Sequence, residues 1–84
     1  MMKELAKAKN KLKKFGMDES FIVKQADVLL AQFNAGNHPG DALKQMRNNI
    51  RYWQRINVLD TNPLRDIRLD YFNLMVDYME RNLA

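Results

Sequence analysis

The sequence predicts an all-α domain: a small bundle of three main helices plus a short basic N-terminal helix. Apolar residues recur every three or four positions along most of the chain, which is the period of a helix buried on one side. Glycine and proline interrupt this pattern at Gly16, at 36–40 and at Pro63, and so divide the chain into four segments. The 84 residues, with no internal repeat, are enough for a single helical domain over 1–84.

The first predicted helix covers about residues 2–15. Its apolar residues form one narrow stripe: Leu5, Ala8, Leu12 and Phe15. Gly16 is placed to end it in the left-handed conformation that glycine adopts readily. A helix this short has little stability of its own, so the sequence leaves open whether it docks on the bundle or stays free.

The second predicted helix covers about residues 18–34, with Asp18 as its N-cap. Most of its apolar side chains share one face: Ile22, Val23, Ala26, Leu29, Leu30 and Phe33. Phe21 and Val28 point the other way, so we expect this helix to contact neighbours on two sides.

The third predicted helix covers about residues 41–58 and carries two separate stripes. One is apolar: Ala42, Leu43, Met46, Ile50 and Trp53. The other is basic, at helical spacing: Lys44, Arg47, Arg51 and Arg55. A basic stripe of this kind is a solvated face, a source of charge selectivity for a protein partner, or a contact to a phosphate backbone.

The fourth predicted helix covers about residues 63–82, with Asn62 as its cap and Pro63 in its first position. Apolar residues cover about two thirds of its circumference, well beyond the arc that an ordinary surface helix buries. We therefore expect it either to be the central element of the fold or to serve a second interface. The residues chosen for an apolar partner contact are Leu69, Phe72, Val76 and Met79. Its polar stripe is acidic and includes Asp66, Asp70 and Asp77.

The net charge of +4 is distributed unevenly. Residues 1–14 carry +5 and the rest of the chain carries −1. The N-terminal lysines form a candidate electrostatic arm: Lys7, Lys9, Lys11, Lys13 and Lys14. Such a helix solubilises the domain or steers it towards an anionic protein, nucleic acid or membrane surface.

Groups that catalysis or metal binding would need are scarce in the sequence. There is no cysteine, and the one histidine, His38, falls in a loop rich in glycine and proline. The one serine, Ser20, stands near a helix start, where capping is its usual role. We expect no catalytic residues, no cofactor and no metal, and therefore a protein that is not an enzyme.

The compartment is predicted from what the sequence lacks. Its longest strictly apolar run, 28–31, is far short of the roughly 20 residues of a membrane span. No apolar segment follows the basic N-terminus as it would in a secretory signal. These features predict a cytoplasmic protein without a transmembrane segment.

Taken together, the sequence favours a non-enzymatic protein-interaction module. It would act stoichiometrically as a regulator, inhibitor or adaptor, and it would self-associate as a homodimer or higher oligomer through the last helix. The alternative is nucleic-acid binding through the basic stripe of the third helix and the lysine-rich first helix. A second alternative is peripheral binding to an anionic membrane surface.

Overall fold

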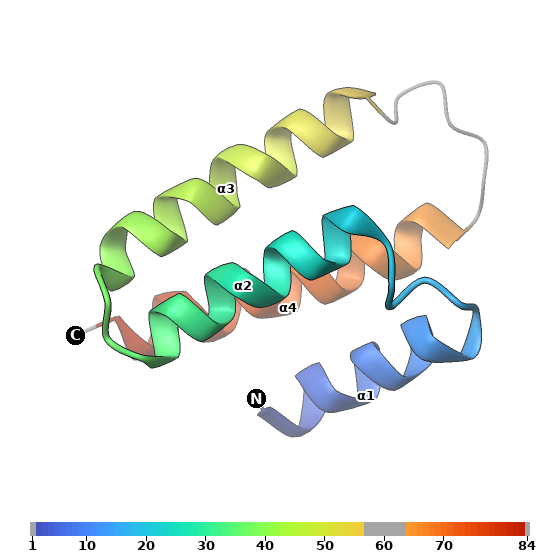
Figure 1. The fold of residues 1–84 in the computed structure, drawn as a ribbon, viewed down its shortest axis with the longest axis horizontal. Helices are drawn as coiled ribbons and strands as arrows, with labels where there is room; N and C mark the ends of the chain where they lie inside the picture. Colours follow the sequence, from blue (N-terminus) through green and yellow to red (C-terminus); the bar gives the residue numbers. More distant parts are fainter. Residues whose placement is uncertain (1, 57–63, 84) are drawn as a thin grey trace.

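The computed structural model describes residues 2–56 and 64–83, and these residues form four α-helices (Figure 1). Helix α1 spans Met2–Lys14, α2 Phe21–Asn34, α3 Pro39–Ile56 and α4 Leu64–Asn82. No strand occurs within the described ranges, and the predicted all-α fold is confirmed.

The helices pack as a bundle in which consecutive helices run in opposite directions (Figure 1). Helix α2 lies in front of α4, with α3 along one side of this pair and α1 along the other. Helix α4 packs against all three other helices, and α2 also packs against α3. The central position expected for the last helix is therefore correct, and the N-terminal helix is docked against it.

The end of α1 and the start of α2 are each set by a capping residue. Gly16 ends α1 with a positive φ of 69°, and the Met17 N–H donates to the Leu12 carbonyl at 2.9 Å, as in a Schellman motif. The prediction that Asp18 caps α2 is wrong. Ser20 has extended backbone angles, and its hydroxyl accepts a hydrogen bond from the Val23 N–H at 3.4 Å, so α2 begins at Phe21.

Helix α3 begins at Pro39, two residues before the predicted start. The fixed φ of proline suits the first helical position, and its missing N–H is not needed there. The carbonyl of His38 accepts hydrogen bonds from the N–H groups of Asp41 and Ala42 at 3.0 and 3.1 Å. The predicted caps of α4, Asn62 and Pro63, lie outside the described residues.

The core lies where α4 meets the other helices. Phe72 and Met75 of α4 are buried against side chains from α1, α2 and α3. The Trp53 ring lies 4.7 Å from the Phe72 ring between centroids, and the Phe33 ring meets the Tyr78 ring edge-on at 6.2 Å. Every helix thus supplies part of one continuous apolar cluster.

The apolar contact residues predicted on the last helix belong to this core. Phe72 and Met79 are fully buried, and Leu69 and Val76 are half-buried and pack against the same cluster. The prediction that Phe72 and Met79 meet a partner is therefore wrong for this fold. Three neighbouring helices cover the wide apolar arc of α4, so that arc stabilises the bundle.

Truncating the α1 stripe tests its docking. Leu12 is fully buried, whereas Phe15, one turn further along, is 46% exposed because α1 ends before it. We expect Leu12→Ala to lower the free energy of unfolding by about 2–5 kcal/mol, the usual cost of emptying a buried leucine site. Phe15→Ala is the matched control and should cost about 0.5 kcal/mol. Urea unfolding measures both, and equal small effects would contradict a docked α1.

Candidate functional site

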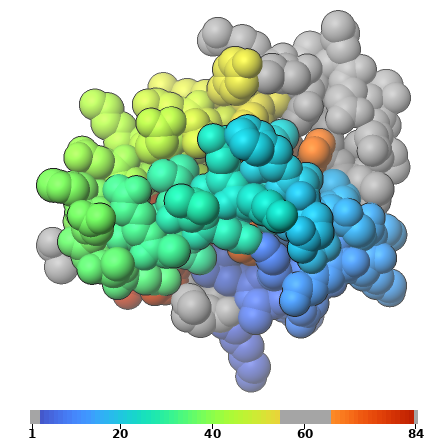
Figure 2. All heavy atoms as spheres, viewed as in Figure 1, coloured from blue at the N-terminus to red at the C-terminus, as the bar shows by residue number. Residues whose placement is uncertain are grey.

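The most exposed large apolar side chains lie on α2 and α3. Phe21 is 75% exposed, Val28 65% and Tyr52 62%. Phe21 and Val28 stand two helical turns apart on the outer side of α2, away from the core. Because α2 and α3 are antiparallel neighbours, Tyr52 in the last part of α3 lies towards the Phe21 end of α2. Figure 2 shows this side of the molecule, with α2 across its middle and α3 above.

A shallow groove of about 240 Å³ separates α2 from α3 on this side. Val28 and Leu29 form its apolar part, and its polar part consists of amides: Gln25, Gln45 and Asn49. The Gln45 amide donates to the Asn49 side-chain oxygen at 2.8 Å. None of these described lining residues is charged. We call this surface, comprising Phe21, Val28, Tyr52 and the groove residues, the α2–α3 face.

The nearest charges on α2 are already paired. Lys24 forms an ion pair with Glu19 at 2.8 Å. The hydrogen bond and the charge of Lys24 lower the pKa of the Glu19 carboxyl, and the same contact with Glu19 raises the pKa of Lys24. The pair balances the charge of Lys24, the one cation of α2.

Further charged residues lie along α1, along α4 and on the edge of α3 that faces α4. Arg47 donates to the Glu80 carboxylate at 2.7 Å. Both residues line a groove between α3 and α4, and Arg51 lines it as well. Lys44 is exposed, and the Arg55 side chain lies outside the described residues. The predicted basic stripe is thus present over Lys44, Arg47 and Arg51, and the charge of Arg47 is balanced by Glu80 of α4.

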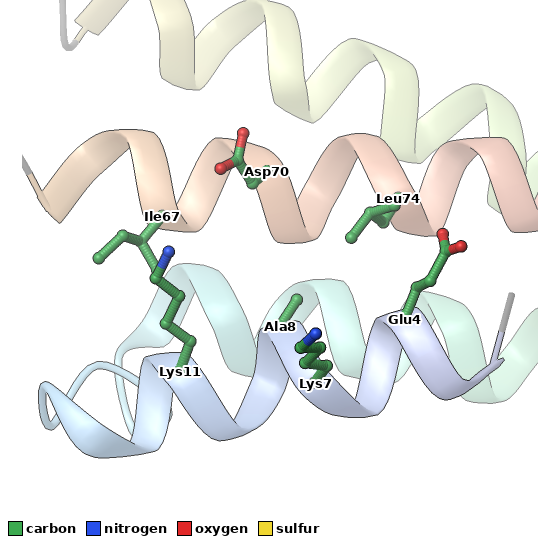
Figure 3. Close-up of a pocket in the computed structure, with 7 residues that line it drawn as sticks. All are labelled: Glu4, Lys7, Ala8, Lys11, Ile67, Asp70 and Leu74. Atoms are coloured by element: carbon green, nitrogen blue, oxygen red, sulfur yellow. The ribbon is translucent and has the colours of Figure 1, made fainter.

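Helices α1 and α4 border a second groove, of about 310 Å³ (Figure 3). Lys7 and Lys11 line it from α1, and Asp70 lines it from α4. Its remaining lining residues are Glu4 and three apolar side chains: Ala8, Ile67 and Leu74. Lys13 and Lys14 are exposed beyond it, so four of the five predicted arm lysines face solvent or this groove.

Lys9 departs from the predicted electrostatic arm. Its ammonium forms a hydrogen-bonded ion pair with Asp27 of α2 and lies 5.6 Å from the centre of the Tyr71 ring of α4. The Tyr71 hydroxyl donates to the other Asp27 carboxylate oxygen at 2.5 Å. Lys9 therefore points inward and joins α1 to α2 and α4, because Asp27 is within reach of both donors.

Tyr71 is buried at this junction, and its ionisation is suppressed. Burial raises the pKa of the Tyr71 phenol well above its ordinary value of 10.0, and the hydrogen bond to Asp27 and the Asp27 charge raise it further. The neutral phenol is the form that can donate to the carboxylate. The network of Lys9, Asp27 and Tyr71 therefore joins α1, α2 and α4 to one another.

Among the described side chains, the lysines of α1 and the arginines of α3 form two separate basic groups. Asp70 lies beside the α1 lysines and Glu80 beside the α3 arginines, so the acidic side chains of α4 stand between the two basic groups. A long polyanion laid across this side would meet carboxylates as well as cations. The arrangement differs from the uniform basic stripe that phosphate binding favours.

Other kinds of site find no support in the described part of the chain. No three His, Cys, Asp or Glu side chains gather there as metal ligands would. No helix in the described ranges combines the length and apolarity needed to cross a bilayer. Ser20 caps α2, and His38 stands in the turn after the far end of the same helix.

Comparison with known proteins gives no functional guide: no protein-family model, no curated protein and no solved structure matches this chain. The α2–α3 face was the surface that sequence reasoning did not assign. Its signal was present in Phe21 and Val28, which point away from the apolar face of their helix and were expected to meet a second neighbour. In the part of the chain that the structure describes, both side chains stay exposed.

Replacing the buried phenol tests the junction through its pH dependence. Because the pKa of Tyr71 is higher in the folded than in the unfolded chain, its contribution to stability is present below pH 10.0 and is lost as pH rises above that value. Tyr71→Phe should lower stability at neutral pH by about 1–3 kcal/mol, through the lost hydrogen bond to a charged acceptor. It should also reduce the fall of stability at alkaline pH.

The matched control is Tyr78→Phe, since Tyr78 donates to the Asn34 side chain at an exposed site at 2.8 Å. Urea unfolding at several alkaline pH values compares wild type, Tyr71→Phe and Tyr78→Phe. An alkaline fall of the same size in wild type and Tyr71→Phe would show that the phenol is not held neutral by the fold.

Proposed function

We propose that this chain is a non-enzymatic protein-interaction module that binds a protein partner stoichiometrically, as a regulator, inhibitor or adaptor, through the α2–α3 face. The observation that carries the proposal is the exposure of Phe21, Val28 and Tyr52 on two neighbouring helices, beside a groove whose described lining residues carry no charge. Interface cores are enriched in aromatic residues and depleted of charge, as this face is.

The exposure of these side chains has no explanation within the bundle. Phe21 and Val28 add nothing to the core, and leaving them in water forgoes the roughly 1.5–3 kcal/mol that burying each side chain would contribute. Single exposed apolar residues are ordinary, but several on one neutral face indicate a surface that another molecule covers. The amides of Gln25, Gln45 and Asn49 offer hydrogen bonds that a protein partner can satisfy.

Nucleic-acid binding is less well supported by the same surfaces. Arg47 is paired with Glu80, and Asp70 stands beside the lysines of α1, so phosphates would compete with carboxylates at both places. The α2–α3 face offers no cation inside its groove to balance a phosphate.

Membrane-surface binding needs apolar and cationic residues on one helix, with the apolar side free to enter the bilayer. On α1 the apolar side is occupied, because Leu5 and Leu12 are buried in the bundle. On α2 the exposed apolar side chains are Phe21 and Val28, and the helix carries one cation, Lys24, which is paired with Glu19. Neither helix meets both requirements.

The positions of Ser20 and His38 do not suit a serine nucleophile activated by histidine. Ser20 precedes α2 and His38 follows it, so about 20 Å of helix separates them. A serine nucleophile needs a base within hydrogen-bond reach. These two residues do not form such a pair.

Two sets of substitutions, one on the α2–α3 face and one on the α1–α4 groove, distinguish the candidate partners. Val28→Glu places an unpaired charge in the proposed contact, whereas Lys7→Glu with Lys11→Glu reverses charge on the α1–α4 groove. A partner recovered from extracts of the source cell, identified and then titrated in purified form, should bind the Val28→Glu variant at least about tenfold more weakly. It should bind the double lysine variant with nearly unchanged affinity.

Circular dichroism melts of both variants supply the folding control, since all three substituted positions are exposed. Affinity lost in the lysine variant but kept in Val28→Glu would contradict the proposed face. Binding of DNA, RNA or anionic vesicles that falls steeply with salt would then favour one of the alternatives.

A further inference from the structure

We infer that the α2–α3 face of the isolated protein is covered by a second copy of the chain, in a two-fold dimer whose α2 helices pack antiparallel and cross at Val28. The inference depends on the proposed function, because it names one partner for the same face. It replaces the expected self-association through the last helix, whose apolar residues are in the core.

Shape is the first argument for a second copy. Phe21, Val28 and Ala35 follow one another at seven-residue spacing, which keeps them on the same side of α2 and its cap. Ala31 is exposed between the last two. This side of α2 is therefore bulky at its start, medium in its middle and small at its end.

Such a gradient is complementary to itself in one orientation. With the two helices antiparallel and centred on Val28, each Phe21 lies against Ala35 of the second copy, at the same distance from the axis. Small residues at one end allow the helices to approach closely enough for the ring to be covered. A parallel pair would instead stack Phe21 on its own copy and leave a gap between the two Ala35 residues.

Charge is the second argument. Near a two-fold axis each residue meets its own copy, so any charge at the axis is repelled. The residue at this axis is Val28, and the adjoining groove has no charged lining. The two Lys24 side chains would lie about 12 Å apart along the helices, and each is already paired with its own Glu19.

Size is the third argument. The molecule measures 37 × 26 × 19 Å, and the α2–α3 face lies on its broad side, which is the side seen in Figures 1 and 2. A broad side of these dimensions has room for the roughly 800 Å² that each partner buries in an interface of standard size.

The test uses the absence of cysteine from the natural chain. A single Val28→Cys substitution places two thiols at the proposed axis, and mild oxidation should link most of the protein into covalent dimers. Phe15→Cys is the matched control: it is an exposed apolar position outside the face and should stay largely unlinked.

Orientation is tested by mixing two further variants. Phe21→Cys and Ala35→Cys should each give little covalent dimer alone, and their mixture should give the linked heterodimer. Linking of Phe21→Cys to itself, with none in the mixture, would overturn the antiparallel arrangement.

Light scattering over a range of concentrations supplies a readout without cysteine. Wild type should approach the mass of a dimer, and Val28→Glu should raise the dissociation constant at least about tenfold. High salt should leave the wild-type dimer intact, because the contact is neutral. Far-ultraviolet circular dichroism confirms that each variant keeps the fold.

A wild-type protein that stays monomeric, with no linking through Val28→Cys, overturns the dimer. The proposed function then stands or falls separately, on whether Val28→Glu weakens an identified partner. A dimer that Val28→Glu leaves intact, or that Phe15→Cys links as well as Val28→Cys does, also overturns the inference, because another face then forms the contact.

Discussion

Helix α4 carries apolar side chains around most of its circumference, and in water such a helix is stable only where other helices cover it. The bundle meets this constraint from three sides: α1, α2 and α3 all pack on α4. Phe72, Met75 and Met79 are buried as a result. The side of α4 that stays in water is acidic, and it separates the basic residues of α1 from those of α3. The position of α4 therefore decides both where the core lies and how surface charge is arranged.

The docking of α1 completes the cover of α4 and requires more than a narrow apolar stripe. Asp27 receives hydrogen bonds from Lys9 and Tyr71, and so joins three helices at one carboxylate. The ion pair and the two hydrogen bonds offset the free-energy cost of removing the Asp27 carboxylate partly from water. Burial of Tyr71 keeps its phenol neutral and able to donate. In consequence one lysine of the basic helix has a structural role, while those on its outer side remain exposed.

Periodicity was sufficient to predict the helices and the central place of the last one, because burial on several sides leaves a wide apolar arc. It could not say whether that arc meets the chain itself or a partner, since Phe72 would look the same in either case. The start of α3 differs from the predicted one because Pro39 stands among glycines, which indicates a turn, although proline also fits the first position of a helix. The inward turn of Lys9 was not predictable, because it depends on Asp27, eighteen residues away. Val28 lies opposite the apolar face of its helix, which predicts a second neighbour for α2. In the described part of the bundle Val28 is exposed.

The surfaces left free follow from this packing: a neutral, partly apolar face on α2 and α3, and a side of alternating charge along α1, α4 and α3. The central claim is that α1 belongs to the folded unit and covers α4. Hydrogen exchange of the backbone amides tests it most directly. We expect the α1 amides between Leu5 and Leu12 to exchange as slowly as those of α4 around Met75, through opening of the whole bundle. Rapid exchange of α1 beside a protected α4 would contradict the account, because it would show a detached helix and an apolar side of α4 open to partners.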